Sequence, residues 1–389
     1  MEDRNLIPPP LFHNGKMESM KLKIWLLIAT FSFLFIFPST TYSQGPPPPK
    51  NETIEATVTD VAEGKTIDVD GREQLHQTLQ LIVTDGSIKG KNITVENGDI
   101  QRVNVPEYKA GDKVIVTATK DFEGNDKYFI QDYIRRDSLY LLFFFFLVVA
   151  VVIGLKRGIL ALVGMAFSFL IIFSFILPQI SQGRDPILIA VIASIAIIPV
   201  TFYLSHGINR KTTSAIIGTF IALVLTGILA NVFVEAARLT GFASEEAGFL
   251  QNEMNGQINI KGLLLAGIIV SVLGILDDIT VSQAAVVYQL KKLSPTLGFK
   301  DLYLHAMDVG RDHIASVVNT LVLVYTGAAM PLLLLFVNSS RPFGQVINHE
   351  VIAEEIIRTL VSSIGLILAV PITTLLTAYV VSMKKHVKK

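Results

Sequence analysis

Long apolar runs separated by short polar stretches dominate the chain after Arg136. Each run is long enough to cross the roughly 30 Å of hydrocarbon in a bilayer as a helix. The pattern therefore predicts a membrane protein, mostly α-helical, with a bundle of seven spans in residues 137–389. The predicted spans are Ser138–Leu155, Gly158–Pro178, Pro186–His206, Ser214–Val234, Gly262–Leu290, Ile314–Val337 and Ile356–Ser382.

A separate apolar run, Leu22–Pro38, lies near the N-terminus. Lysines lie before and at its start, at Lys16, Lys21 and Lys23, and small residues such as Ser43 follow it. This arrangement is typical of a signal peptide, and an uncleaved anchor, which would make eight spans, is the alternative. In either case residues 1–44 would deliver the chain that follows to the outside.

Residues 45–136 show short alternating or β-branched stretches between turn sequences such as DGS, ENGD and KAGD. Five strands in so small a unit predict an all-β domain resembling a partly open oligonucleotide/oligosaccharide-binding (OB) barrel, with a plain sandwich as the alternative. Aromatic and basic residues do not interleave in it, so a spacer or docking role is favoured over ligand or nucleic-acid binding. The predicted strands are Thr53–Val61, Thr78–Thr84, Lys91–Asn97, Lys113–Thr119 and Lys127–Ile134.

Charge distribution predicts the topology independently, because cytoplasmic loops of membrane proteins carry an excess of lysine and arginine. If the β domain lies outside, alternate loops should be basic. The loops concerned hold Lys156 and Arg157, then Arg210 and Lys211, then Lys291, Lys292 and Lys300, and finally the tail KKHVKK. We therefore expect a multi-pass protein of the cell (plasma) membrane with an extracytoplasmic β domain and a cytoplasmic C-terminus.

Overall composition adds two points. Hydrophobic residues make up 51% of the 389-residue chain, and 33 basic residues balance 33 acidic ones, so no net charge favours a nucleic-acid partner. Cysteine is absent from the sequence, which excludes disulfides and thiolate metal sites.

Two adjacent acids interrupt one membrane-length run, in the stretch GILDDITVSQ that ends at Gln283. A central aspartate costs about 2.5 to 3.5 kcal/mol on insertion scales, so it is expected to face protein or water. Helical spacing places Asp278 on a small or polar stripe, while Asp277 lies about 100° away around the helix. The alternative is a helix that leaves the membrane with solvated acids at its inner end. This first stripe consists of Ser271, Gly274, Asp278, Ser282, Ala285 and Gln289.

The next segment, LYLHAMDVGRDHIASVVNT, carries a second polar stripe flanked by Arg311 and His313. Buried acids need partners, so we expect the two stripes to face each other, with Arg311 or a protonated histidine supplying counter-charge. An interfacial N-terminal turn of the helix, with Arg311 at lipid phosphate, is the alternative. This second stripe consists of His305, Asp308, Asp312, Ser316 and Asn319.

With these residues assembled, the chain resembles the YibE/F-like membrane protein family in nearly its whole organisation. The specific part comprises LGILDDITVSQAAVVYQL and HAMDVGRDHIASVVNTLVLVYTGAAMPLLLL. This resemblance implies an architecture rather than a reaction. The aspartate helix, its Lys-Lys-x-Ser-Pro connector and the next span are also distantly similar to resistance-nodulation-division exporters, which implies that Asp277 and Asp278 relay protons. A later-span lysine is missing, two extra spans precede the aspartates and the exported domain is smaller, so drug efflux is in doubt.

Together these features predict ion- or proton-coupled secondary transport of a small solute or ion, with no cofactor. No P-loop, HExxH or GxSxG stretch appears, which disfavours ATP hydrolysis and hydrolytic catalysis. The main alternative is a non-transporting scaffold or envelope-assembly factor whose exported domain recruits a partner or a second copy. An intramembrane aspartate enzyme is a weaker third reading, and the sequence leaves metal binding undecided. The candidate relay residues are Asp277, Asp278, Ser282, Gln283, His305, Asp308, Arg311, Asp312, His313 and Asn319.

Overall fold

A computed structural model of the chain describes residues 52–62, 65–69, 72–98, 105–120, 124–254 and 256–383. The predicted signal segment at 1–44 lies outside these ranges. The described residues form two units, one with the β-strands and the first part of helix α2 up to Val149, the other beginning at Ala150. Each unit is described by itself below.

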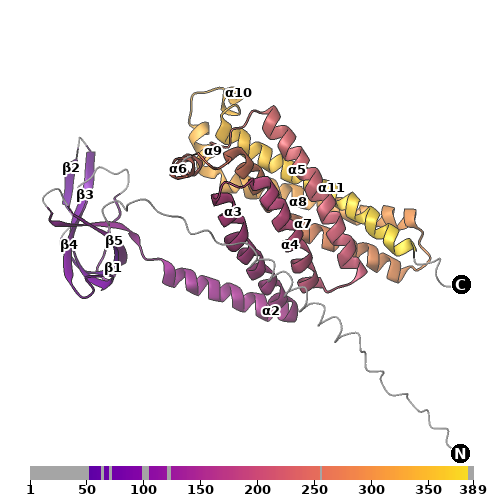
Figure 1. The fold of residues 1–389 in the computed structure, drawn as a ribbon, viewed down its shortest axis with the longest axis horizontal. Coiled ribbons are helices and arrows are strands. Elements are labelled where there is room, and N and C mark those ends of the chain that lie inside the picture. The colour runs from indigo at the N-terminus through magenta and orange to yellow at the C-terminus, as the bar shows by residue number, and fades with distance from the viewer. Residues whose placement is uncertain are drawn as a thin grey trace, which may run out of the picture. The chain divides into compact units, whose positions relative to one another are not determined.

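The first unit is a curled antiparallel sheet (Figure 1). Its hydrogen-bonded order is β2-β3-β1-β5-β6, and β4 pairs with the second half of β3. The five predicted strands are confirmed, and β2 is an additional strand that the pattern did not predict. The strands are β1 (Glu52–Val61), β2 (Lys65–Val69), β3 (Arg72–Asp85), β4 (Asn92–Asn97), β5 (Lys113–Lys120) and β6 (Asp126–Tyr133).

Alternation of side chains builds the core of this sheet, because successive residues of a strand point to opposite faces. In β1 the buried positions are Ile54, Ala56 and Val58, and matching residues of the other strands complete one apolar cluster. Predicted turns contain glycines with positive φ, such as Gly111 at +97°, where other residues would be strained.

Two ion pairs hold the start of the first helix against this sheet. Arg136 donates to both carboxylate oxygens of Glu55, at 2.5 and 2.7 Å. Lys113 lies 2.7 Å from Asp137. The side chains that follow, from Leu139 to Phe146, are all exposed and apolar, as expected of a helix surrounded by lipid.

The second unit is helical and continues the chain from α2. Polar side chains cap several of its helices: Asp185, Asn209 and Asn259 accept hydrogen bonds from backbone amides in the first turns of α4, α5 and α7. The elements are α2 (Arg136–Ile171), η1 (Ile172–Ile176), α3 (Leu177–Ser181), α4 (Pro186–His206), α5 (Arg210–Ala236), α6 (Glu245–Glu253), α7 (Ile260–Leu293), α8 (Phe299–Ala328), α9 (Met330–Val337), α10 (Phe343–Val346) and α11 (Glu350–Ser382).

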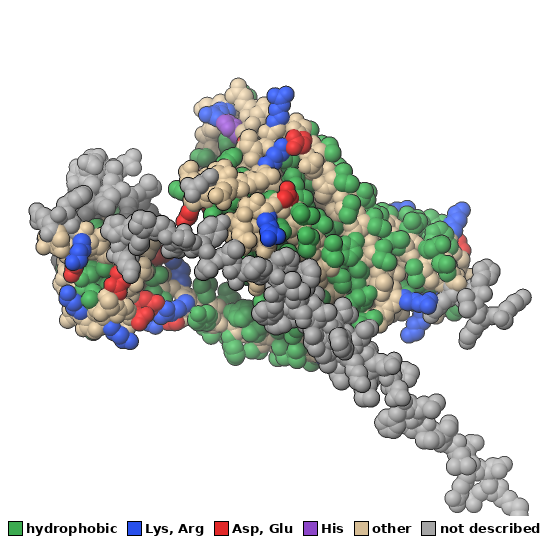
Figure 2. All heavy atoms as spheres, viewed as in Figure 1, with side chains coloured by type: hydrophobic (Ala, Val, Ile, Leu, Met, Phe, Trp, Pro, Cys, Tyr) green, Lys and Arg blue, Asp and Glu red, His purple; other side chains and the backbone are tan. Residues whose placement is uncertain are grey.

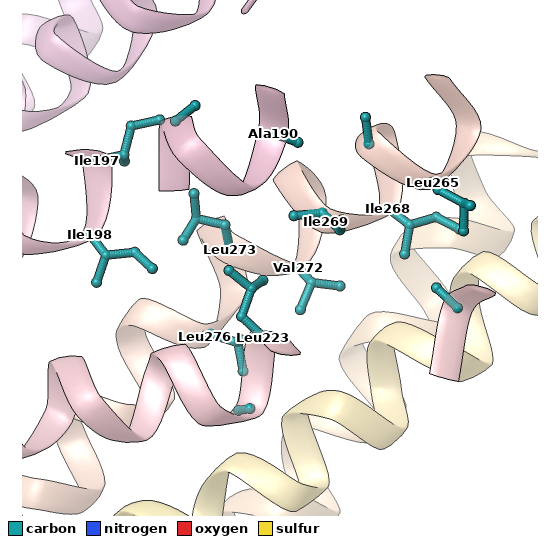
Figure 3. Packing of buried hydrophobic residues seen from close by; sticks show 14 of the residues in the cluster. Ala190, Ile197, Ile198, Leu223, Leu265, Ile268, Ile269, Val272, Leu273 and Leu276 are labelled. Carbon is teal, nitrogen blue, oxygen red and sulfur yellow. The ribbon is translucent and has the colours of Figure 1, made fainter. Parts of the chain in front are cut away.

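Helix α7 lies at the centre of this unit, against α4, α5, α8 and α11 (Figure 1). Ile268, Val272 and Leu276 of α7 pack with Ile198 of α4 and Leu223 of α5 (Figure 3). Hydrophobic side chains also cover much of the visible outer surface of the unit, and charged side chains gather toward its ends (Figure 2). An apolar exterior between charged ends is the pattern of a bundle embedded in lipid.

The predicted count of seven or eight spans is not confirmed. Among the described residues, five helices are long and apolar enough to cross a membrane, or six if α8 and α9 together form one span. Those two helices meet at a 71° bend, so the predicted continuous span Ile314–Val337 is broken at Ala329. The run from Arg136 to Ser181 counts as a single candidate, although Leu155 inside it is non-helical with φ 49° and ψ −134°. That break falls where the sequence predicts the loop between the first two spans.

Candidate functional site

The two predicted polar stripes do not face each other. Asp278 and Ser282 are exposed, and so are His305, Asp308 and Asp312. The contact between α7 and α8 is made by other faces, where Gln283 lies against Ala306 and Gly310. The prediction that the stripes pack together is therefore wrong. Its physical reason is steric, because small residues on the opposite face of α8 allow the closest approach between the helices.

The remaining predicted residues have mixed positions. Arg311 pairs with Asp308 at 2.6 Å, one turn away on the same helix, and both side chains are exposed. Asn319 is also exposed, while His313 is half-buried. Asp277 is half-buried, and its buried Oδ1 atom has no hydrogen-bond partner among the residues that the structure describes.

Gln283 is the predicted residue that lies deepest in the bundle, with only 2% of its surface exposed. Its Nε2 atom donates to the carbonyl oxygen of Ala306 on α8 at 2.8 Å and to the hydroxyl of Thr374 on α11 at 2.7 Å. A buried amide with both donors used fixes three helices relative to one another.

A larger set of buried polar residues lies along α5, α7 and α11. Thr219 on α5 and Thr280 on α7 share a hydrogen bond of 2.8 Å. We call the set the polar seam, because its members lie where α5, α7 and α11 pack together. It consists of Thr212, Ser214, Thr219 and Thr226 on α5, Thr280 and Gln283 on α7, and Ser362, Ser363, Thr373, Thr374 and Thr377 on α11.

Close helix contacts bring α5 and α11 together along this seam. A Cβ atom placed at Gly218 would overlap the hydroxyl of Thr373, and one at Gly365 would overlap that of Thr226. Glycine at these two positions lets a threonine side chain of one helix touch the backbone of the other. Polar oxygens are thereby held at the middle of an otherwise apolar bundle.

Several seam oxygens have no partner in the described part of the chain. The hydroxyls of Thr212, Ser362, Thr373 and Thr377 are buried and accept or donate no hydrogen bond. A buried polar group without a partner costs about 1 to 3 kcal/mol. Such groups indicate a place where water, an ion or a polar solute completes the hydrogen bonds.

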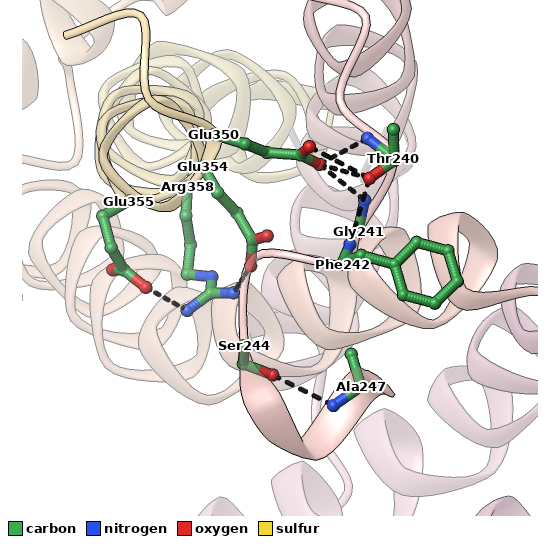
Figure 4. A network of polar contacts seen from close by, with 9 residues as sticks. All are labelled: Thr240, Gly241, Phe242, Ser244, Ala247, Glu350, Glu354, Glu355 and Arg358. Atoms are coloured by element: carbon green, nitrogen blue, oxygen red, sulfur yellow. Dashed lines mark hydrogen bonds and ion pairs between the residues drawn. The ribbon is translucent and has the colours of Figure 1, made fainter. Parts of the chain in front are cut away.

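Charged residues gather at one end of the seam, in the first turns of α11 (Figure 4). Arg358, one turn before Ser362, donates to Glu354 at 2.5 Å and to Glu355 at 2.7 Å. Glu350 accepts hydrogen bonds from the backbone amides of Thr240 and Gly241, in the connection that follows α5. The connection after α5 is thus tied to the start of α11.

Sequence reasoning missed most of the seam. Threonine is common in membrane helices, and a single threonine hardly lowers the mean hydropathy of an apolar run. One signal was present, since Thr212, Thr219 and Thr226 repeat every seven residues and so share one face of α5. Among the residues that the structure describes, no group of three histidine, aspartate or glutamate side chains is arranged to hold a metal ion.

The fold and its apolar exterior define the class of protein: the chain has the helices of a multi-pass membrane protein, with a buried polar seam through the bundle. Within that class the family is established. A family model for the YibE/F-like protein matches residues 142–383, and the chain belongs to this family. Comparison with curated proteins and with solved structures found no match.

Proposed function

We propose that this protein is a secondary transporter, driven by an ion or proton gradient, in which the polar seam is the path across the bundle. The observation that supports it is the set of unpartnered hydroxyls, including Thr373 and Thr377, deep between α5, α7 and α11. A hydroxyl group can both donate and accept hydrogen bonds, so it can bind water, a proton carrier or a cation. Such binding is weak enough for release, which transport across a membrane requires.

Asp277 is the acid that we assign to this path. It lies one turn before Thr280 on α7, and one of its carboxylate oxygens is buried with no partner in the described segments of the chain. Intramembrane carboxylates commonly mark ion or proton pathways. Asp278, exposed on the opposite side of the α7 backbone from Gln283, is the less favoured relay. The proposal involves no catalytic step, and the solute carried is a small molecule or ion.

The orientation that we propose places the β unit outside the cytoplasm and the basic connections inside. Strand order supports an OB-like barrel for that unit: β1 pairs with β3 and β5, β3 with β4, and β5 with β6, while β4 and β6 approach each other. In the cysteine-free chain, Ser87→Cys should react with an impermeant thiol reagent in intact cells, and Ser294→Cys should not. The reverse pattern would contradict this orientation.

The test of the seam needs no knowledge of the solute. Single cysteines at Thr373, Thr377 and Ser362 would be exposed to a small water-soluble methanethiosulfonate in native membranes. The matched control is Ala190→Cys, which is equally buried but lies in the apolar core of α4 (Figure 3). Because the reagent attacks thiolates in water, a hydrated path should react and the core position should not.

Equal and slow labelling at all four positions would show a dry seam, and the transport proposal would then be dropped. The rival function, a scaffold for envelope assembly, has one specific observation in its favour. The two hydrogen bonds donated by the amide of Gln283 and the tight contacts at Gly218 and Gly365 are features of rigid packing. The scaffold function would be favoured if the seam is dry and if the Thr373→Val variant complements a deletion of the gene as well as the wild type does.

A further inference from the structure

The outward direction of the second polar stripe, termed the α8 stripe below, raises a separate question. His305, Asp308, Asp312, Ser316 and Asn319 are all exposed along one side of α8. The side that packs on the bundle carries Leu302, Ala306, Met307 and Gly310 instead. The polar stripe therefore points away from every other described helix.

The depth of this stripe follows from the neighbours of Gly310. A Cβ atom placed there would lie 2.6 Å from Val370 on α11 and 3.0 Å from Gln283 on α7. Along α11, Val370 is about 18 Å beyond Arg358, and along α7, Gln283 is about 12 Å before Lys291. These distances add to about 30 Å, which is the thickness of the hydrocarbon layer.

Asp308, Arg311 and Asp312 are within two residues of Gly310, so the helical rise places them about 9 to 15 Å inside the charged end of α7 at Lys291. This position disfavours the alternative of an interfacial helix start. Charged side chains at such a depth do not face acyl chains, because the loss of solvation is too costly. Asp312, moreover, makes no ion pair with any residue that the structure describes.

We infer that the α8 stripe is the interface between two copies of this chain, packed α8 against α8, with Arg311 bonded to Asp312 of the partner subunit. Charge complementarity favours a second copy as the occupant. A twofold interface must be complementary to itself, and this stripe carries acids, an amide and a histidine, with the guanidinium of Arg311 beside it. The apolar run Ser138–Leu155 has no charged group to offer.

Cysteine cross-linking in native membranes tests this inference on the full chain. Ser316→Cys places a small thiol in the middle of the stripe, where a twofold axis would bring the two copies of it together. Ile217→Cys is the matched control, because it is 45% exposed and apolar, and its neighbour Gly218 lies against α11 at nearly the depth of Gln283. Mild oxidation should yield a dimer from Ser316→Cys, and Ile217→Cys should stay monomeric.

Charge reversal then tests the pairing. In the Ser316→Cys background, Arg311→Asp should lower the yield of dimer about tenfold, because acids would then oppose acids. Adding Asp312→Arg should restore it, and Arg311→Lys should retain most of it. Monodispersity in detergent, followed for each variant, separates a lost interface from a lost fold.

Four results would overturn the inference: no cross-link from either Ser316→Cys or a second stripe position, Asn319→Cys; a product of the wrong mass, which would indicate another protein; equal cross-linking of Ile217→Cys; or a dimer yield insensitive to charge reversal. The experiment does not depend on hydration of the seam. A dry seam with a charge-sensitive dimer would reject transport and keep the interface.

Discussion

Substituting Gly365 by alanine should separate α5 from α11 at a defined point of the seam. The new methyl group would overlap the hydroxyl of Thr226 and lie 2.9 Å from its Cγ2 and 3.0 Å from its Cβ. Thr226 has little room to turn away, because it is 1% exposed and its hydroxyl donates to Ala222 at 2.7 Å.

The size of the effect can be worked from two opposing contributions. Overpacking of a closed interior costs about 1 to 3 kcal/mol. Alanine regains up to about 1 kcal/mol of helix propensity over glycine. Because three atoms of Thr226 lie within 3.0 Å of the new carbon, the upper part of the overpacking range, about 2 to 3 kcal/mol, applies. Less the gain of about 1 kcal/mol in propensity, Gly365→Ala should lower the free energy of unfolding by about 1 to 2 kcal/mol. For a unit of this size that is a fall of about 2 to 8 °C in melting temperature.

The assay is thermal melting of the purified chain in detergent, read as the fraction that stays monodisperse after heating. Gly274→Ala is the matched control, because nothing lies within 4 Å of a Cβ placed there, so this variant keeps only the gain in helix propensity and its melting temperature should stay the same or rise slightly. Combining Gly365→Ala with Thr226→Ala removes two of the clashing atoms, so the pair should cost less than the sum of the single changes. If Gly365→Ala melts like Gly274→Ala, the close approach of α5 and α11 is refuted.

Three further predictions concern other contacts. Gln283→Leu removes two buried hydrogen bonds, including the one to Thr374. It should lower the free energy of unfolding by about 1 to 2 kcal/mol in the same melting assay, more than the exchange of one apolar residue for another at an equally buried position. Ser87 lowers the pKa of Glu52 through hydrogen bonds from its hydroxyl and its amide, so Ser87→Ala should raise that pKa toward its ordinary value in a carbon-13 NMR titration. The sign follows from linkage. A carboxyl group whose pKa is lower in the folded than in the unfolded state stabilises the fold at pH values above its unfolded-state pKa, and this stabilisation is lost as the pH falls through its folded-state pKa. Glu350→Gln weakens the bonds to the connection after α5, and limited proteolysis there should become faster while Glu350→Asp gives an intermediate rate.

Local patterns in the sequence predicted much of the fold, because they depend on neighbouring residues. Alternation identified five strands, and apolar runs identified the long helices. Strand β2 was missed since five residues of mixed polarity, KTIDV, give too short a pattern. The break at Ala329 was missed because Met330 and Pro331 continue the apolar run, and hydropathy does not distinguish a straight helix from one bent by 71°.

The candidate site was harder to predict, because periodicity shows which residues share a face and not what that face meets. Asp278 and Asp312 were correctly placed on polar stripes, yet both stripes point outward. The contacts that bury Thr373 and Thr226 depend on glycines of a helix more than 100 residues away in sequence. Only the packed structure shows such pairs.

Gln283 links the seam to the α8 stripe in physical terms. Its amide bonds Thr374 inside the seam, and through Ala306 it holds the face of α8 opposite the stripe. Hydrogen bonds are directional and apolar contacts are not, so a shift of α8 against a second copy would disturb this amide before it disturbed the surrounding packing. A bistable position of α8 would then open or close the seam beside Thr374. Without such a second position, the same amide would only make the bundle rigid, which is the behaviour expected of a scaffold.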